Sequence, residues 1–160
     1  MSNQPAEIRT LLLYLDQAFG RRAWHGTTLS AAVRGLTVKQ ALWRPGPRRH
    51  NIWELVLHTA YWKSTVHRRL TGGERGTFPR PGVDWPSLPE RPDAREWARD
   101  VRLLKSEHAL FRKMVEDFPA ARLHKRIPGT RFIPIEQIQG IAAHDLYHCG
   151  QIQLLKRLQR

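Results

Sequence analysis

Apolar residues recur every three or four positions in four long segments of the sequence, and this spacing constrains the fold more than any other feature. Such a repeat places the apolar side chains on one face of an α-helix. The segments run from about Gln4 to Trp24, from Asn51 to Gly72, from Asp93 to Pro119 and from Pro134 to the C-terminus. Amphipathic helices bury their apolar faces against one another. The spacing therefore predicts an all-α, four-helix bundle in which residues 1–160 form a single domain.

Capping residues mark the ends of two of these helices. Asn51 is a favoured N-cap residue, and Glu54 three positions later completes a capping-box pattern. Gly72 and Gly73 stop the same segment, as glycine does at many helix C-termini. Pro134 suits the first turn of the last helix, where its missing N–H costs no hydrogen bond. The second and fourth predicted helices therefore have clear starts.

The connections between the helices are long. Residues 26–50 are predicted to hold short helical pieces at 30–34 and 38–43. Residues 72–92 are rich in proline and glycine and are predicted to form a loop without regular structure. A loop of this length can travel the full height of a bundle, so the second and third helices can run parallel. Residues 123–133 contain a Pro-Gly step and are predicted to form a small hairpin.

The charge balance is strongly basic, yet it does not indicate a nucleic-acid surface. The formal net charge is +13, from 27 Lys and Arg against 14 Asp and Glu. The basic residues are dispersed, and no aromatic-interleaved basic stripe accompanies them. No apolar run approaches the roughly 18 residues of a membrane span, and the N-terminus lacks signal-peptide features. We therefore expect a cytoplasmic protein with no specific nucleic-acid partner and no membrane partner.

The strongest chemical signal is a pair of histidines, His144 and His148, in the last predicted helix. Residues four apart on a helix lie about 40° apart around its axis, so both imidazoles point the same way. The pair interrupts the apolar stripe that continues at Ile141 and Ile152. Two imidazoles in a bundle core are costly unless their nitrogens are satisfied. A divalent metal bound between them would satisfy both.

A third ligand has to come from upstream of this pair. The pattern is similar to the zincin His-Glu-x-x-His with Asp in place of Glu, but no histidine or carboxylate follows His148. A zincin-type protease is therefore excluded. His58 lies on the flank of the buried stripe of the second helix and is the first candidate. His108, at a buried position of the third helix, is the competitor, with a core or supporting role as its other interpretation.

Two segments carry a family resemblance, residues 51–58 (NIWELVLH) and residues 141–152 (IAAHDLYHCGQI). Together they resemble the DinB/YfiT-like superfamily, and the likeness covers nearly the whole chain. The three-histidine spacing with the following Gly-Gln is its most specific part. The resemblance implies a four-helix bundle with up-down-down-up topology. It also implies a metal triad of one histidine on the second helix and a His-x-x-x-His pair on the fourth, which falls on His58, His144 and His148.

The resemblance sets the expected cofactor and leaves the activity open. Zinc or nickel is the first choice for three imidazoles, with iron, cobalt and manganese as alternatives. Some relatives are metal-dependent transferases or isomerases that use low-molecular-weight thiols. A thiol S-transferase or a hydrolase acting on a small molecule is therefore one hypothesis, with a homodimer as a possible assembly. A non-catalytic stress-response bundle and a basic nucleic-acid-associated accessory protein are the alternatives. The sequence specifies no catalytic residue.

Several other residues near the motifs have two interpretations. Gln151 could orient a metal-bound water or form a hydrogen bond at the bundle edge. Glu54 could support an imidazole, although its capping role explains it, and Tyr61 could bind substrate or pack in the core. Cys149 is expected to be a free buried thiol pointing away from the metal, and Asp145 to face solvent.

The wall of the pocket above the metal is expected to come from the end of the first helix and the connection after it. Trp24 and His25 lie at that helix end, and residues 26–50 follow directly. Three imidazoles from two helices would occupy one side of the metal and leave its other side open, as in catalytic zinc sites.

Overall fold

The computed structural model of the protein describes residues 4–20, 23–73 and 78–160. These residues form six α-helices and one short 3-10 turn, and no β-strand occurs among them. The helices are α1 (Ala6–Phe19), α2 (Leu29–Ala32), α3 (Val38–Leu42), α4 (Ile52–Thr71), α5 (Ala94–Asp117) and α6 (Pro134–Leu158), and the 3-10 turn is η1 (Ala120–Arg122). The all-α prediction is confirmed. The short helices α2 and α3 lie where short helical pieces are predicted.

The predicted helix starts agree with the structure. The Asn51 side chain accepts a hydrogen bond from the Glu54 backbone N–H at 2.8 Å, and the Glu54 carboxylate accepts one from the Asn51 N–H at 3.0 Å. Asp93 caps α5 in the same way through the Glu96 N–H. Gly72 ends α4 with φ 75°, a left-handed conformation that glycine adopts without a steric penalty. These caps satisfy backbone groups that would otherwise lack partners at the helix ends.

The first helix is shorter than predicted, because α1 ends at Phe19 and not at Trp24. Gly20 leaves the helix with ψ −157°, while its N–H still bonds the Asp16 carbonyl at 2.8 Å. A β-carbon at this position would lie 2.4 Å from that carbonyl oxygen, so the turn requires glycine. Residues 21 and 22, which the prediction placed in the same helix, lie outside the described residues.

The hairpin predicted for residues 123–133 is wrong. The segment consists of turns, and its backbone bonds go to its own neighbours and to α6. The buried Leu123 accepts a hydrogen bond from the Ile135 N–H in the first turn of α6, at 3.1 Å. The Thr130 N–H bonds the Ile127 carbonyl at 3.1 Å. Because this segment is tied to the start of a helix, its backbone groups do not pair as two strands.

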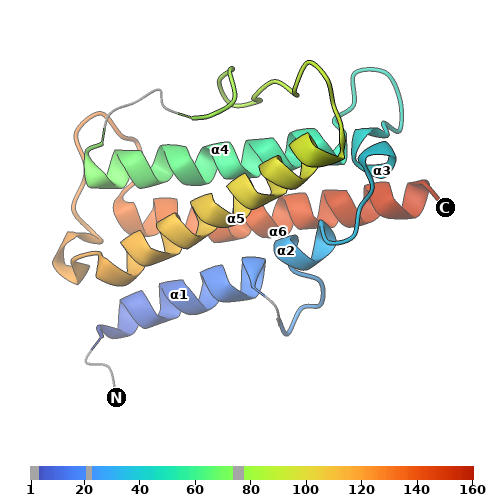
Figure 1. Cartoon of the computed structure of the whole chain (residues 1–160). Coiled ribbons are helices and arrows are strands. Elements are labelled where there is room, and N and C mark those ends of the chain that lie inside the picture. Colours follow the sequence, from blue (N-terminus) through green and yellow to red (C-terminus); the bar gives the residue numbers. More distant parts are fainter. Residues whose placement is uncertain (1–3, 21–22, 74–77) are drawn as a thin grey trace.

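The four long helices lie side by side. Helix α4 packs against both α5 and α6, and α1 packs against the same two helices. The colours of Figure 1 show α4 and α5 running in one direction and α1 and α6 in the other. Helix α3 contacts α4, and α2 contacts α6 and α1, so both short helices sit at the end of the bundle where α4 begins. No described helix is long and apolar enough to cross a membrane.

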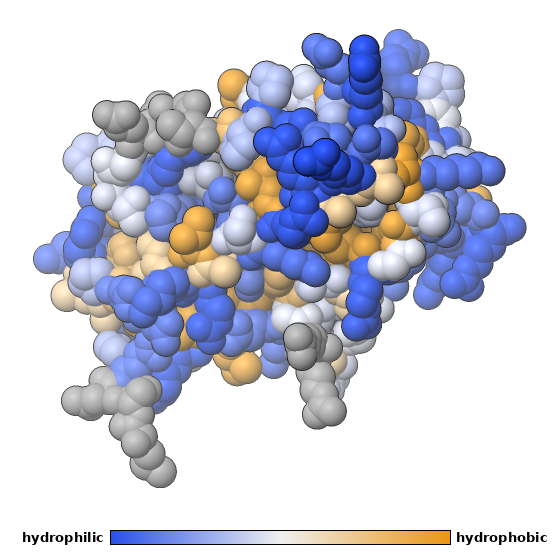
Figure 2. Space-filling model, in the orientation of Figure 1, coloured by the Kyte–Doolittle hydropathy of each residue, from blue (hydrophilic) through white to orange (hydrophobic). Residues whose placement is uncertain are grey.

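The interior is divided into two apolar clusters. One joins α2, α3, the first halves of α4 and α5, and the last turns of α6, and it includes Trp53 and Leu104. The other joins α1, the ends of α4 and α5, and the start of α6, and it includes Phe111 and Ile138. In α4, α5 and α6, buried polar residues lie between the two sets. Figure 2 shows hydrophilic side chains covering most of one outer face, with apolar patches between them.

Asp145 is one of the buried polar residues between the two apolar clusters, which corrects the expectation that it faces solvent. Its side chain is fully buried on α6 and forms an ion pair with Lys63 of α4, which is fully buried as well. Burial lowers the pKa of Lys63 and raises that of Asp145, and the attraction between the two groups opposes both shifts. Each charge therefore depends on its partner, since an unpaired charge in a bundle core is strongly disfavoured.

His108 of α5 is another titratable residue among the buried polar side chains between the two clusters. Its ring stacks on Phe19, with centroids 3.8 Å apart, and its Nδ1 is buried without a hydrogen-bond partner in the described part of the chain. Burial, and then the charge of Lys63, lower its pKa to about 3. The core role predicted as one interpretation of His108 fits this position, which is away from the other buried histidines.

His108 should make the fold sensitive to acid. An unfolded histidine has a pKa of about 6.5, so between pH 6.5 and 3 the unfolded chain binds a proton that the folded chain does not. As the pH is lowered through this range, the free energy of unfolding should therefore decrease. The contribution of His108 to this decrease is up to about 1.4 kcal/mol per pH unit. In metal-free protein unfolded with urea between pH 7 and 5, His108→Leu should show a shallower dependence than wild type. An unchanged slope in His108→Leu would contradict the assignment.

Candidate metal centre

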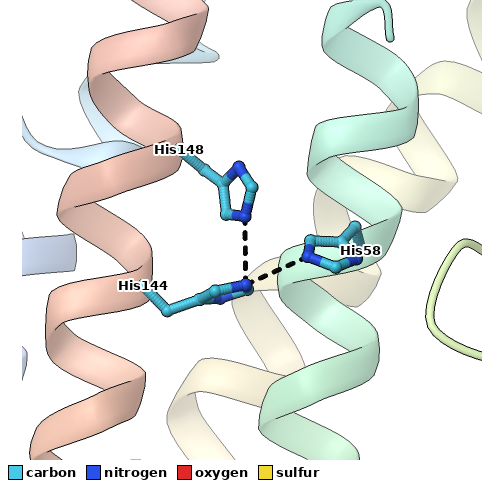
Figure 3. Close-up of side chains that lie close together, drawn as sticks. All are labelled: His58, His144 and His148. Atoms are coloured by element: carbon cyan, nitrogen blue, oxygen red, sulfur yellow. Dashed lines mark hydrogen bonds between the residues drawn. The ribbon is translucent and has the colours of Figure 1, made fainter.

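Three histidine side chains converge between α4 and α6. His58 lies in the second turn of α4, and His144 and His148 lie on successive turns of α6. Figure 3 shows the three rings pointing toward one another from the two helices. The His144 Nε2 lies 3.0 Å from the His58 Nε2 and 3.0 Å from the His148 Nε2. All three ligand atoms lie within 4.8 Å of one another, so the cluster could hold a metal ion.

The spacing of these nitrogens suits a small divalent ion. Zinc binds imidazole nitrogen at about 2.0–2.1 Å, so two ligands of a tetrahedral site lie about 3.3 Å apart. The two nitrogen–nitrogen distances of 3.0 Å are close to that value. Small rotations of the side chains would bring these two pairs to the tetrahedral spacing.

Hydrogen bonds on the far side of two rings determine which nitrogen is free. The His58 Nδ1 lies 2.7 Å from the Asp84 backbone carbonyl, which can only accept, so this nitrogen carries the proton. The His148 Nδ1 donates to the Gln151 side-chain oxygen at 2.6 Å. A neutral imidazole with a protonated Nδ1 has a lone pair at Nε2. Both lone pairs therefore point into the centre of the cluster.

Protein groups alone cannot satisfy this arrangement. The His144 Nε2 faces both lone pairs, and a single N–H there can donate to only one of them. The His144 Nδ1 is buried and has no hydrogen-bond partner among the residues described. At least one buried acceptor is left without a donor, which is unfavourable. A cation at the centre would accept all three lone pairs, so the donor set fits a divalent metal.

The environment also keeps the imidazoles neutral. Burial lowers the pKa of His144 to about 3 and that of His148 to about 4, and it lowers the pKa of His58 as well. Neighbouring histidines and Lys63 add to the effect for His144 and His148. Metal binding requires the neutral form of histidine. The three side chains are thus in the ligand state at neutral pH.

A sequence model of the DinB superfamily matches residues 21–152, most of the chain and all three histidines. The chain belongs to the DinB superfamily. Neither the curated proteins nor the solved structures gave a match. The family assignment thus confirms the resemblance found in the sequence, and the DinB-type triad of one histidine on one helix and a pair on another falls on side chains that meet in space.

Sequence analysis missed two residues beside the three histidines, Asp84 and Trp85 in the loop between α4 and α5. Trp85 stacks on His58 with ring centroids 3.9 Å apart. The Asp84 carboxylate accepts a hydrogen bond from Trp62 Nε1 at 2.7 Å, while its backbone carbonyl fixes His58. Arg80, earlier in the loop, pairs with Asp100 of α5 at 3.0 Å. A tryptophan beside an aspartate among prolines was the one signal that this loop packs against the bundle.

The cluster of three histidines opens into a cavity of about 760 Å³. Its walls include Leu55 of α4, Tyr147 of α6, Trp85, and Arg48 and Arg49 from the connection before α4. The prediction that residues 26–50 supply part of the wall agrees with this. Trp24 and His25 were also predicted there, but they do not line the cavity. Trp24 is 95% exposed, and the His25 ring bonds the Gln17 carbonyl at 3.1 Å, because the chain turns away at Gly20.

The other candidate residues lie outside the cluster. Cys149 is a buried free thiol, as expected, and its sulfur donates to the Thr27 carbonyl at 3.2 Å. Glu54 is occupied by its capping bonds and by Arg44, at 2.7 and 2.5 Å. Tyr61 packs edge-on against Phe78 and lines a second cavity of about 630 Å³. Gln151 does contact the cluster, because its side-chain oxygen bonds the His148 Nδ1 on the side of the ring away from the proposed metal position.

Gln151 should tune metal affinity without being a ligand. Loss of a group that orients a ligating histidine usually weakens metal binding by about 10–100-fold. We expect this loss for Gln151→Ala, because without Gln151 the neutral His148 ring could carry its proton on either nitrogen. Competition with a chromogenic chelator measures the affinity. Gln153→Ala is the matched control, since its amide donates to Thr27 outside the cluster. Equal affinities of Gln151→Ala and wild type would refute this role.

Proposed function

We propose that this DinB-superfamily protein binds one divalent metal through His58, His144 and His148 and uses it as a transferase or hydrolase of small molecules. The observation that carries the proposal is the convergence of three neutral imidazoles at the base of an open cavity. Zinc or nickel is the proposed metal. The helix directions in Figure 1 support the up-down-down-up topology that goes with this family.

A divalent ion held there would supply Lewis-acid chemistry, lowering the pKa of a water or thiol that binds beside it. The chain's own residues prepare the position. The Asp84 carbonyl and Gln151 hold two rings in the ligating tautomer, and Trp85 covers the face of His58. In the part of the chain that the structure describes, no cysteine or carboxylate oxygen joins the three nitrogens. A site with three protein ligands keeps a coordination position for substrate, whereas closed structural sites use four.

The open position gives the proposal its test. Protein stripped with a chelator and reloaded with cobalt should show a visible spectrum that changes when azide or 2-mercaptoethanol is added. The change should saturate at one exogenous ligand per metal. The control is His124→Ala, which removes an exposed histidine that is not part of the cluster and should respond like wild type. A cobalt spectrum that stays the same with every added anion would indicate saturated protein coordination and a purely structural metal.

A further inference from the structure

Two arginines stand at the mouth of the metal cavity on the short connection between α3 and α4. Arg48 and Arg49 both line the cavity, and both are exposed to solvent. Tyr147, Leu154 and Leu155 of α6 contribute apolar surface to the same cavity. The cavity thus combines three histidines that could hold a dipositive ion, a cationic edge of two exposed arginines and apolar surface from α6.

The negative groups near the cavity are already engaged. Asp84 is its one acidic lining residue among those described, and its carboxylate accepts the Trp62 indole N–H. Glu54 lies behind the turn and binds Arg44 through both oxygens. Neither carboxylate forms an ion pair with Arg48 or Arg49 in the described structure. The cationic edge is therefore not neutralised from within the cavity.

The turn that presents these arginines is held in place. Arg44 donates to the Arg49 carbonyl at 2.5 Å while it is bound to Glu54 in the capping box of α4. The Arg49 N–H bonds the Gly46 carbonyl at 3.4 Å. His50, next in sequence, stacks on Trp85 with centroids 3.5 Å apart, and Trp85 stacks on His58. A chain of contacts therefore links the turn to a histidine of the metal cluster.

Arg48 adopts an unfavourable backbone conformation within this turn. Its φ is 58°, in the left-handed region that favours glycine and asparagine. A bulky residue in that region is uncommon, and such residues cluster at functional sites. Asparagine or glycine would suit this backbone conformation better. The backbone therefore gives no reason for an arginine at position 48, and its side chain needs another explanation.

We propose that Arg48 and Arg49 form an anion subsite, so that the substrate is a small molecule with an oxyanion group at one end and a metal-binding donor at the other. Guanidinium groups bind carboxylates and phosphates through paired, charge-assisted hydrogen bonds. The apolar wall of Tyr147 and Leu154 would contact the part of the molecule between its two ends. This inference rests on the proposed function, because it assumes that the metal position is open to an added ligand.

The test uses three thiols as probes on cobalt-loaded protein, each titrated by the change in visible absorption. The probes are 3-mercaptopropionate, 2-mercaptoethylphosphonate and the neutral 3-mercapto-1-propanol. We expect the two anions to bind at least about tenfold more tightly than the neutral thiol. The ratio of the two anions tells whether the subsite prefers a carboxylate or a phosphate-like group.

Two variants assign the preference to the arginines. Arg48→Asn and Arg49→Gln should each reduce the preference for anions to about threefold or less, while the affinity for the neutral thiol stays unchanged. Arg48→Asn should also melt at the wild-type temperature or higher, because asparagine tolerates the left-handed backbone. Arg95→Gln, an exposed arginine of α5 that does not line the cavity, is the matched control.

The outcomes separate the subsite from the function it rests on. Equal binding of anionic and neutral thiols, or an anion preference that survives in both arginine variants, would refute the subsite and leave the open metal position standing. A cobalt spectrum that responds to none of the three thiols would refute the proposed function itself. Metal content and melting temperature, measured for each variant, confirm that the variant retains its fold and its metal.

Discussion

Asp145→Leu is expected to lower the free energy of unfolding by about 3–5 kcal/mol, the usual cost of removing one partner of a buried ion pair. Lys63 and Asp145 are both fully buried, between the two apolar clusters of the bundle. Leucine leaves the Lys63 ammonium in the core without its carboxylate, so the lysine has to lose its proton or draw water into the bundle. Urea unfolding of metal-free protein at pH 7 measures the effect.

The double variant Lys63→Met/Asp145→Leu is the control for this prediction. It removes both charges and keeps similar side-chain volumes, and such replacements are often neutral or stabilising. We expect it to recover most of the stability lost in Asp145→Leu. If the double variant were as unstable as the single one, loss of packing would explain the result, and the ion pair would have no special role.

His144→Ala is expected to have the largest effect on metal binding. The His144 Nε2 is the central atom of the cluster, 3.0 Å from each of the other two ligand nitrogens. Removing it leaves two ligands on different helices, and affinity should fall by more than the roughly hundredfold that a supporting residue can account for. Chelator competition with zinc measures the loss.

The metal-free fold should tolerate His144→Ala better than it tolerates Asp145→Leu. The His144 Nδ1 is buried without a partner in the described structure, so its removal takes away an unsatisfied polar group. The cost is then mainly the small cavity left by the ring. His124→Ala, with an exposed ring paired to Glu7, should keep both metal affinity and stability. Normal zinc affinity in His144→Ala would exclude this histidine as a ligand.

The local features of the fold were predictable because they depend on neighbouring residues. Asn51 and Glu54 cap α4 through bonds three residues apart, and Gly72 ends it, so a short stretch of sequence contains the whole interaction. The proximity of His144 and His148 follows in the same way from helical spacing. His58 could be placed beside them because its position in the buried stripe of α4 directs it into the bundle.

The features that were missed depend on partners far apart in the chain. Asp145 is followed by exposed residues and read as a surface position, but Lys63 lies 82 residues earlier and pairs with it in the core. Asp84 and Trp85 lie in a loop without regular structure, whose packing depends on contacts with α4 and α5. Residues 123–133 have a hairpin-like sequence, yet their backbone bonds are local turns and one bond from Ile135 of α6 to the Leu123 carbonyl.

If three imidazoles from two helices bind one divalent ion per chain, the metal content of the purified protein should show it. Elemental analysis should be made on two samples. The first is the protein after gentle purification, and the second is chelator-treated protein dialysed against zinc and then against metal-free buffer. We expect one ion per chain in the zinc-dialysed sample and none in the His144→Ala sample treated identically. A wild-type protein that remains metal-free after dialysis against zinc, with its three histidines bonded only to protein groups, would contradict this expectation.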